Sequence, residues 1–558
     1  GVAGDSWSDE YAGEAYNYAQ NWEELLRTQR GVNLGPAGTF PDAAPDRECL
    51  VRFGEAQLGG TLGTYRIWMT DATRRTWTTR LKLDNSDLDV TFVYGNSRVI
   101  YNAGSHYVGS PFVSPGFTGP TGALCGYVVS FPKDDPFLGA GDLKLDWPVR
   151  DPALQMEQVA YWIADQLRLP TSHRRFVHLY VNGVKRGTVY EDSQQPNSDL
   201  VEQYFPDDAD GDLYKIDDWF EFDAGAGGFA NRDATLDNFT TTDGAKKLAR
   251  YRWNWRKRAV QESANDYRSL FALVDAATTQ DSPAFTEAVE AQMDVEEWMR
   301  VIALEHLVGN WDSFGYQRGK NMSAYKPVSG RWNLLMWDID FVLSASGDSA
   351  DSYLYSTIDP TISSMMFHPP FRRVYLRALA DAANGPLRAA NFGPLIAANH
   401  RALLANGISP GLPTGGSNYL TARLRNVQNE LNGLEQRFTV NVPSSSFTVT
   451  NNLLILTGTA PVKVKELRIN GVPARVTWIS ETEWTLQLPL SAATNTLQLV
   501  GFDSHGRAIG GFARTLNVRY PGTFDSAAGH LVFNEILHHP SVPGATFVEL
   551  FNASTTTA

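Results

Sequence analysis

The sequence predicts an α+β protein of two lobes, followed by a small all-β domain. From about residue 48 to 150 the sequence is rich in short apolar or alternating runs between Gly and Pro, a pattern typical of strands. The regions 245–310 and 365–435 instead predict helices. After them, residues 437–521 contain short strand-like runs with regular turns and few helix formers, which indicate an immunoglobulin-like β-sandwich.

The two ends of the chain differ from these regions. Residues 1–47 predict a short helix at NWEELLRTQRG and then a Pro-rich linker. The segment HLVFNEILHHPSVPGATFVELFNAS, within residues 522–558, resembles the opening strands of a lamin-tail-like domain and stops before that fold is complete. Because Gly1 begins directly in polar, acidic sequence with no signal peptide, both ends are expected to be cut from a longer protein.

Composition argues against several classes of partner. The 558 residues are 43% hydrophobic and 12% aromatic, enough to bury large cores. The net charge of −14 argues against nucleic acid, whose phosphates demand clustered Lys and Arg. One basic run, 246–258, is expected to be the solvated face of a helix, with phosphate or nucleic-acid binding as the alternative. No apolar run reaches the ~18 residues that a membrane span needs.

The chain has two cysteines, Cys49 and Cys125. No CxxC pair or Cys/His cluster exists, so a zinc site is not expected. Export would allow one disulfide between the two cysteines, but their spacing does not decide whether it forms.

Three local signals place secondary structure near the centre of the chain. Residues 153–169 have apolar positions at helical spacing and predict a helix. Asn182-Gly183, between two β-rich runs, predicts a hairpin. An Asp-x-x-Glu capping box at Asp294 predicts the start of a further helix, and Gly309 predicts its end.

The segment 305–340 carries most of the chemistry. It places Asp312, Asn321, Asp338 and Asp340 among tryptophans and tyrosines. Carboxylate and carboxamide oxygens are the hard ligands that Mg²⁺ takes when it also holds phosphate oxygens. A protein kinase needs the same parts: an Asp that accepts the hydroxyl proton, an Asn that reaches a metal, and a later Asp that holds the metals bridging the phosphates.

The motif NWDSFGYQRGKNMSAYKP, followed by GRWNLLMWDIDFVL, resembles the signature of the CotH family of spore-coat-type atypical protein kinases. The upstream segments FPKDDPFLG, LYVNGVKRGTVYED and GDLYKIDDWF match in the same order, so the resemblance covers roughly residues 60–400. It implies a bilobal kinase-like domain at 48–436, with its N-lobe at about 48–220 and its C-lobe at about 221–436. It also implies Mg²⁺-dependent transfer of the ATP γ-phosphoryl group to Ser, Thr or Tyr hydroxyls of spore-coat or exported surface proteins.

Within this resemblance, Asp312 is the expected catalytic base, and a turn-capping aspartate is the alternative. Asn321 is the expected second metal ligand, although it lies nine residues after Asp312, where kinase catalytic loops have a separation of five. Extra residues within GYQRGK (315–320) must therefore loop out for Asn321 to reach the ion. The alternative is that Asn321 satisfies loop backbone.

Asp338 and Asp340 are two apart in an apolar run that predicts a strand, so their side chains are expected to share one face. Both could then approach one ion. The resemblance implies that Asp338 is the principal ligand, while Asp340 shares the ion or anchors the loop. Two carboxylates in such a run would be costly to bury without a cation or donors.

An adenine base needs a flat apolar slot, and four aromatic residues are candidates. Trp332 is the best placed relative to Asp338, and the others are Tyr190, Tyr180 and Tyr325. Stacking of a base on an aromatic ring contributes about 1–3 kcal/mol. For each of these residues the alternative is a place in the plain hydrophobic core.

The phosphate-binding lysine is expected to be Lys144 or Lys215, both in strand-like context, and either could pair with Glu191. A surface lysine is the alternative for each. The absence of a Walker A motif disfavours a P-loop enzyme. The family's Gly-rich segment is expected near YGNSRVIYNAG (94–104), where the residues that could meet phosphate are Asn96, Ser97 and Arg98.

Two segments resemble binding motifs without fulfilling them. PDDADGDLYKID (206–217) lacks the first and last ligands of a Ca²⁺ loop and predicts an acidic turn. GAGGFA (225–230) has no βαβ unit around it, so a loop is expected rather than a dinucleotide site.

The main alternative function is a non-catalytic cell-surface or adhesion protein built on the same fold. Carbohydrate processing is disfavoured because no convincing acid pair is present. The appended β domains suit an exported protein, in which they would contact a cell surface or glycans. An extracellular or cell-surface location is therefore expected.

Overall fold

The computed structural model describes residues 61–81, 84–96, 98–108, 118–148, 150–218, 233–261, 263–279, 282–344, 346–524, 530–538 and 546–553. The expected helix and linker of residues 1–47, and Cys49, lie outside these ranges. The chain divides into two compact units, Gly1–Gly433 and Leu434–Ala558. Mixed helices and sheets in the first unit and sheets in the second confirm the predicted α+β class.

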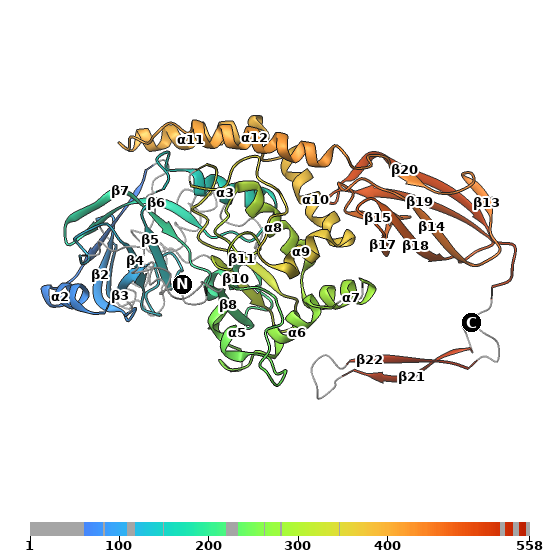
Figure 1. Cartoon of the computed structure of the whole chain (residues 1–558), viewed down its shortest axis with the longest axis horizontal. Coiled ribbons are helices and arrows are strands. Elements are labelled where there is room, and N and C mark those ends of the chain that lie inside the picture. The colour runs from blue at the N-terminus through green and yellow to red at the C-terminus, as the bar shows by residue number, and fades with distance from the viewer. Residues whose placement is uncertain are drawn as a thin grey trace, which may run out of the picture. The chain divides into compact units, whose positions relative to one another are not determined.

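A closed barrel of seven strands forms the first lobe (Figure 1). Neighbouring strands follow the order β1-β2-β3-β4-β5-β7-β6, and the parallel pair β1/β6 closes the ring. The strands are β1 (Gly63–Trp68), β2 (Leu88–Tyr94), β3 (Arg98–Val108), β4 (Gly126–Ser130), β5 (Asp142–Asp146), β6 (Arg174–Val181) and β7 (Val184–Ser193). Helix α2 (Asp71–Thr79) connects β1 to β2.

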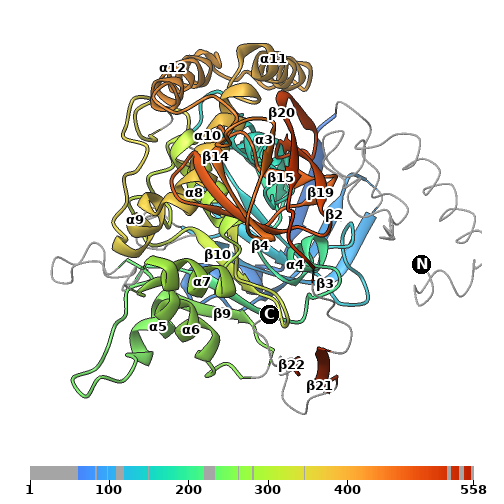
Figure 2. The same ribbon diagram turned by 90° about the vertical axis from the view of Figure 1, so that its right-hand side faces the viewer.

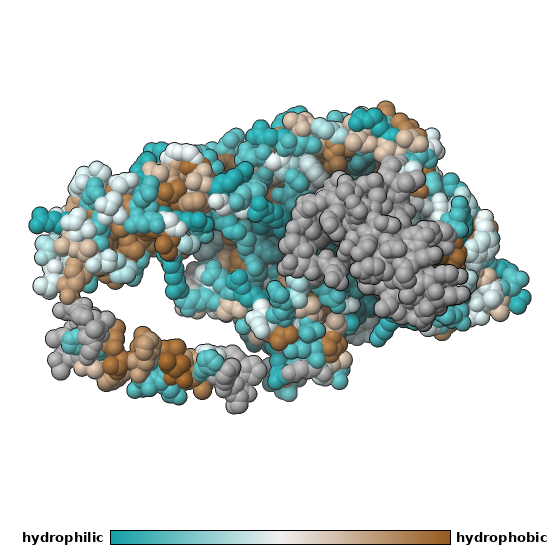
Figure 3. All heavy atoms as spheres, turned by 180° about the vertical axis from the view of Figure 1, so that it is seen from behind, coloured by the Kyte–Doolittle hydropathy of each residue, from teal (hydrophilic) through white to brown (hydrophobic). Residues whose placement is uncertain are grey.

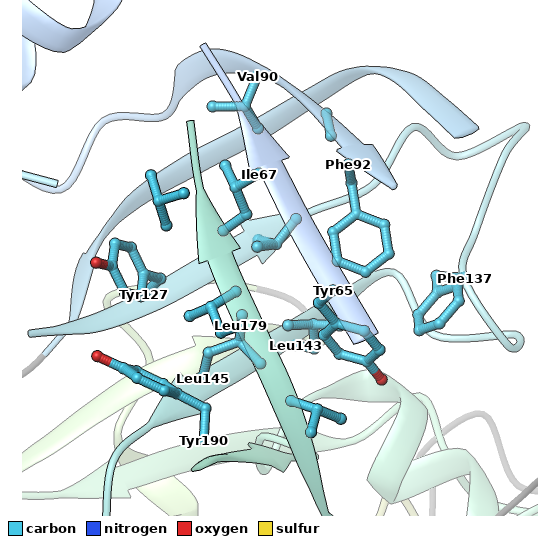
Figure 4. Packing of buried hydrophobic residues seen from close by; sticks show 14 of the residues in the cluster. Tyr65, Ile67, Val90, Phe92, Tyr127, Phe137, Leu143, Leu145, Leu179 and Tyr190 are labelled. Atoms are coloured by element: carbon cyan, nitrogen blue, oxygen red, sulfur yellow. The ribbon is translucent and has the colours of Figure 1, made fainter. Parts of the chain in front are cut away.

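Aromatic side chains fill the interior of the barrel (Figure 4). The ring of Tyr65 lies 5.0 Å from that of Phe92 and 5.6 Å from that of Phe137, both in the edge-to-face geometry that ring quadrupoles favour. Tyr127 and Tyr190 pack together elsewhere in the same core, 6.0 Å apart. Strand β1 alternates between buried and more exposed residues, as expected when one face lines a closed interior.

The hairpin and the helix predicted for the end of this lobe are both confirmed. Asn182 (φ 45°) and Gly183 (φ 77°) form the two-residue turn between β6 and β7, and both lie in the left-handed region that a type I′ turn requires. Helix α3 (Met156–Gln166) follows β5 and packs against a long helix of the second lobe.

The second lobe combines a four-stranded sheet, in the order β11-β10-β8-β9, with helices. Its strands are β8 (Asp212–Ile216), β9 (Trp255–Ala259), β10 (Met322–Lys326) and β11 (Asn333–Met336). The helices from here on are α4 (Ser198–Tyr204), α5 (Leu248–Asn254), α6 (Arg268–Ala277), α7 (Ser282–Gln292), α8 (Val295–Val308), α9 (Pro360–Phe367), α10 (Pro369–Asn384), α11 (Ala389–Ala405) and α12 (Thr414–Leu431). Figures 1 and 2 show α11 and α12 along one side of this unit, away from α5 and α6.

Helix α8 is buried on nearly all sides, which is typical of a helix in the centre of a core. Asp294 caps it, because its carboxylate accepts the N–H of Glu297 at 3.1 Å. The Glu297 carboxylate instead accepts the N–H of Leu334 at 3.0 Å and so ties α8 to β11. Gly309 ends the helix at φ 76°, where a Cβ would lie 2.5 Å from the hydroxyl of Tyr419. The chain therefore leaves α8 in one fixed direction.

The basic run ends in a strand rather than in the predicted helix face. Residues 255–259 form β9, which pairs with β8. Arg256 forms an ion pair with Asp217, and Lys257 Nζ lies 2.8 Å from Asp212 on the other side of the strand. Aspartates at the two ends of β8 therefore hold the run in the sheet. The helix prediction missed this because it used only the spacing of residues within the run.

The second unit contains two sheets that share one core. Their orders are β12-β14-β18-β17 and β13-β20-β19-β15-β16. The strands are β12 (Thr439–Val440), β13 (Ser446–Thr448), β14 (Leu453–Thr459), β15 (Glu466–Ile469), β16 (Val472–Pro473), β17 (Val476–Trp478), β18 (Glu483–Pro489), β19 (Thr494–Phe502) and β20 (Ala508–Arg519). Trp484 is fully buried in this core, which also contains Leu456 and Leu499. The immunoglobulin-like topology stays a prediction.

A separate hairpin, β21 (Leu531–Leu537) and β22 (Phe547–Asn552), follows the sandwich. Figure 3 shows apolar residues on its visible face. The exposed apolar residues of the hairpin include Phe533 and Leu550, which are 70% and 58% exposed. Its assignment to a lamin-tail-like domain stays a prediction. Within the described ranges, none of the helices combines the length and apolar character that crossing a bilayer requires.

Glu305 is a buried carboxyl near the end of α8. Asn310 donates its amide N–H to Glu305 Oε2 at 2.8 Å, while Glu305 Oε1 and Asn310 Oδ1 are buried without a hydrogen-bond partner. Burial raises the pKa of Glu305 to about 8, against the hydrogen bonds from Asn310 and Ser313. If Glu305 is protonated, its O–H can donate a hydrogen bond in the place where Glu305 Oε1 and Asn310 Oδ1 otherwise face no donor.

Replacing Asp294 by Ala should destabilise the first unit by about 1 kcal/mol, because α8 loses the acceptor that caps it. Asp294→Ser keeps an acceptor and should retain most of the stability. Denaturant unfolding of the full chain measures both variants. Equal losses in the two would show that the cap contributes nothing.

The stability of the Glu305→Gln variant should depend less on pH than that of the wild type. Because the folded pKa of Glu305 lies above its unfolded value near 4.3, its contribution is full below that value and is lost as the pH rises through 8. Relative to the variant, the wild type should lose up to about 1.4 kcal/mol of unfolding free energy per pH unit in this window. The measurement is the unfolding free energy of both proteins at pH 5.5 and pH 8.5. The difference between the two proteins cancels the contribution of the other titrating groups. An equal change with pH in both would contradict the raised pKa of Glu305.

Candidate functional site

The loop that follows α8 turns back on itself and brings Asn321 to Asp312. The Asn321 amide Nδ2 donates to the backbone carbonyl of Asp312 at 2.9 Å and to its carboxylate Oδ2 at 3.1 Å. The nine-residue separation is therefore bridged because the extra residues loop out. Buried rings hold them in place, since Phe314 and Tyr316 are fully buried and the Tyr316 ring lies 4.1 Å from that of His306.

Two basic residues of this loop bind acidic residues outside it. Arg318 lies 2.7 Å from Asp218, which follows β8, and 2.9 Å from Asp233. Lys320 Nζ lies 3.4 Å from Asp312 Oδ1 and 3.8 Å from Asp218 Oδ2. These ion pairs fix the loop against the sheet. The sequence analysis did not single out Arg318, Lys320 or Asp218, although the basic residues stand within the segment identified as extra.

The Asp312 carboxyl is suited to accept a proton. Burial raises its pKa, and the cationic Lys320 and Arg318 oppose that rise. The negative charge of Asp338 adds to the rise, so the two acids interact across the site. A carboxylate whose pKa is raised towards neutrality is a more effective general base than one in water.

Asp338 lies after β11 rather than within it. The strand ends at Met336, and Asp338 has a left-handed backbone with φ 55°. The prediction that Asp338 and Asp340 share one face of a strand is therefore wrong, because side-chain alternation stops where the strand ends. Asn321 also has φ 55°. Such strained positions cluster at functional sites, where the surrounding structure enforces them.

Lys144, on barrel strand β5, reaches Asp338 from the other lobe. Its Nζ lies 3.2 Å from Asp338 Oδ1 and 3.2 Å from Asp146 Oδ2, and 4.7 Å from the centre of the Trp337 ring. Burial alone would lower the pKa of Lys144, but the two carboxylates outweigh it and raise the pKa. Burial would raise the pKa of Asp338, and Lys144 outweighs that effect and holds the pKa below its usual value. Both groups are therefore charged at neutral pH.

Asp340 turns to a different partner. Its Oδ2 accepts a hydrogen bond from Arg150 at 2.8 Å, and the Arg150 guanidinium lies 4.2 Å from the centre of the Phe341 ring. This contact fits the predicted loop anchor, and a shared metal ion stays a prediction. Burial and the neighbouring Asp338 raise the pKa of Asp340.

Arg174, on β6, binds two glutamates near Lys144. Its Nη1 lies 2.7 Å from Glu191 and forms a second ion pair with Glu157. The predicted pairing of Glu191 with a lysine is therefore wrong, because the arginine on the adjacent strand takes that carboxylate. Sequence reasoning missed both Arg174 and Glu157. Glu157 lies in α3, the first helix after Lys144, and kinases carry the carboxylate that pairs with their strand lysine on such a helix.

Lys215, the other predicted lysine, has a local role. Its Nζ lies 2.8 Å from Asp217, which also binds Arg256 on the neighbouring strand. Lys215 adds a weaker contribution than Lys144 to the lowered pKa of Asp338. Of the two lysines, Lys144 is therefore the one in contact with the predicted metal ligand.

The predicted adenine platforms are wrong for Trp332 and Tyr190. The Trp332 ring is fully buried 5.1 Å from that of Tyr214, inside the core of the second lobe. Tyr190 is fully buried in the barrel, where its hydroxyl donates to the carbonyl of Cys125 at 2.9 Å. Tyr325 is fully buried as well. Their sequence neighbourhoods do not distinguish a ring in a cleft from a ring in a core.

Of the remaining phosphate candidates, Arg98 is the first residue of β3 and forms an ion pair with Asp135. Ser97 lies outside the described residues. A polar cavity of about 250 Å³ occurs elsewhere, lined by residues that include Asp212 and Lys257. It shares no lining residue with the site around Asp312, so it is a separate feature.

The donor set fits Mg²⁺. In the described part of the chain, no group of three or more His, Cys, Asp or Glu side chains is arranged to hold a metal. Mg²⁺ in phosphate-handling sites needs only one or two carboxylates, because the substrate phosphates supply further oxygens. The amide nitrogen of Asn321 binds Asp312, so its amide oxygen is the atom that would bind a metal ion. The Asp338 side chain is 40% exposed and charged.

Comparison with known proteins places the chain in a family. The profile of the CotH kinase protein family matches residues 127–431, more than half of the chain. No curated protein is significantly similar to the chain. Among solved structures, the crystal structure of a Helicobacter pylori proinflammatory kinase, CtkA, is similar at 12% identity over 54% of this chain and 90% of that one, with a TM-score of 0.23.

The family match covers the site and the second lobe. Its boundaries enclose Lys144, Asp312, Asn321 and Asp338, the residues between which the contacts described above run. The chain belongs to the CotH kinase family.

Proposed function

We propose that this protein transfers the γ-phosphoryl group of ATP to hydroxyl groups of Ser, Thr or Tyr in exported or surface proteins, with Mg²⁺. The observation that carries the proposal is the pair of contacts at the site, Asn321 on Asp312 and Lys144 on Asp338. These contacts pair the proposed base with a carboxamide and the proposed phosphate-binding lysine with a carboxylate, which are the residue types that a kinase needs.

In this reaction Asp312 orients the acceptor hydroxyl and takes its proton. Its raised pKa favours that proton transfer, and the hydrogen bonds from Asn321 fix the carboxylate in one orientation. A buried, oriented base raises the effective concentration of the reacting groups as well as the driving force.

Lys144 and Asp338 would bind the two halves of the metal–nucleotide complex. Lys144 would turn from Asp338 to phosphate oxygens, while Asp338 and the amide oxygen of Asn321 would hold the ion. Bound Mg²⁺ would neutralise charge that develops on the phosphate oxygens. The ion pair seen at 3.2 Å keeps both groups charged and close until those ligands arrive.

The β domains that follow are proposed to contact a cell surface or glycans, and the protein is proposed to act outside the cell. The exposed apolar residues of β21 and β22 support a binding role for this part of the chain. A non-catalytic adhesion protein would keep that role and lose the phosphoryl transfer.

Asp312→Asn and Asp338→Asn should both abolish phosphorylation, and nucleotide binding should separate them. Asp312→Asn removes the proton acceptor and should lower the rate about 10²–10⁴-fold while Mg²⁺–ATP still binds. Asp338→Asn removes a metal ligand and should weaken Mg²⁺–ATP binding itself. The measurements are incorporation of labelled γ-phosphate into a generic acceptor or the protein itself, and calorimetric titration with Mg²⁺–ATP.

Asp351→Asn is the matched control, because that carboxylate is exposed and hydrogen-bonds to Ser349. It should leave both binding and transfer unchanged. If the wild-type chain neither binds Mg²⁺–ATP nor transfers phosphate to any acceptor, the adhesion alternative replaces the proposal.

A further inference from the structure

We propose that Lys320 is a further catalytic residue, whose ammonium group binds the phosphoryl group during transfer. This inference rests on the proposed function. Lys320 immediately precedes Asn321, and its Nζ lies 3.4 Å from the carboxylate Oδ1 of Asp312. Lys320 thus lies beside the base. It contacts one carboxylate oxygen of Asp312, and Asn321 binds the other.

The loop fixes the position of Lys320 at its backbone and at its neighbours. The N–H of Phe314 donates to the Lys320 carbonyl at 2.8 Å, and the N–H of Gly319 donates to Asp233 at 2.9 Å. Arg318 is held by Asp218 and Asp233 through ion pairs. The lysine is therefore placed before any substrate arrives, so little further ordering is needed when it acts.

The ammonium group of Lys320 lies among carboxylates, 3.4 Å from Asp312 Oδ1 and 3.8 Å from Asp218 Oδ2. Its positive charge would stabilise an anionic group that reacts beside Asp312. The phosphoryl group, with charge spread over three oxygens in the transition state, is such a group.

The Lys320 side chain also has access to a substrate. It is 20% exposed, compared with 9% for Asp312 and 2% for Asp218. Its ammonium can therefore exchange part of its contact with Asp312 for a phosphate oxygen without leaving the loop. When Asp312 takes the proton and becomes neutral, the attraction of Lys320 to that carboxyl falls and its charge is available to the phosphoryl group.

The acceptor hydroxyl oxygen forms a bond to the γ-phosphorus, and its proton goes to Asp312. The bond from the γ-phosphorus to the bridging oxygen breaks, and its electron pair leaves with ADP. Lys320 keeps its protons throughout and stabilises the charge on the transferred phosphoryl oxygens.

Binding of ATP compared with ADP tests the contact directly. Calorimetric titrations with Mg²⁺–ATP and Mg²⁺–ADP use the full chain as wild type, Lys320→Met and Lys320→Arg. Lys320→Met should weaken ATP about 10-fold and leave ADP unchanged, since the contact is to the γ-phosphoryl group alone. Lys320→Arg keeps the charge and should retain most of the affinity for ATP.

Catalysis gives a second readout. Lys320→Met should lower kcat about 10²–10³-fold, as removal of one preorganised donor does, while the KM for the protein acceptor changes little. Lys326→Met is the matched control, because that lysine is the last residue of β10 and its ammonium group donates to the carbonyl oxygens of Pro327 and Gly330 instead. It should leave both nucleotides and kcat unaffected.

Each outcome separates the inference from the function on which it rests. A wild-type chain that binds neither nucleotide overturns the proposed function. A wild type that is active, with Lys320→Met weakening ATP and ADP equally or leaving kcat unchanged, overturns the role of Lys320 alone. If Lys320→Met does not fold, Lys320→Gln removes the charge, keeps a donor beside Asp312, and is compared in the same way.

Discussion

The ion pair between Lys144 and Asp338 is the contact on which the site depends. It joins a strand of the barrel to the segment after β11, and so links the two lobes at the point where the expected nucleotide phosphates and metal would meet. The lysine is almost entirely buried, so the attraction is stronger than at a surface, and removal of Lys144 would leave Asp338 and Asp146 without the cation that they share. The same two groups can therefore both hold the lobes together and exchange partners when phosphate and metal bind.

The rest of the site consists of ion pairs and hydrogen bonds, and two of its residues have a left-handed backbone. Asn321 and Asp338 both have φ 55°, and each is held there by side-chain contacts from another segment. Arg174 forms ion pairs with Glu157 and Glu191, whereas Lys144 forms ion pairs with Asp338 and Asp146.

The barrel extends beyond the part of the chain that matches the family. The match begins at residue 127, in β4, so strands β1, β2 and β3 precede it. These strands turn a sheet with open edges into a closed ring, because β1 pairs with β6. Tyr65 and Phe92, which they contribute, lie in the aromatic core. The closed barrel thereby fixes the position of β5, and with it the position from which Lys144 reaches the second lobe.

The sequence alone determined the α+β class, the Asn182-Gly183 turn, the end of α8 at Gly309 and the family, because each depends on local chemistry or on motifs in a fixed order. It also identified Asp312, Asn321 and Asp338 as the residues to bring together. The tertiary structure decided which lysine meets Asp338 and which glutamates Arg174 takes, since these partners come from strands and helices distant along the chain. It also decided that Trp332 and Tyr190 are core residues. Burial depends on every element that packs against a ring, and the local sequence around the ring does not show which distant elements these are.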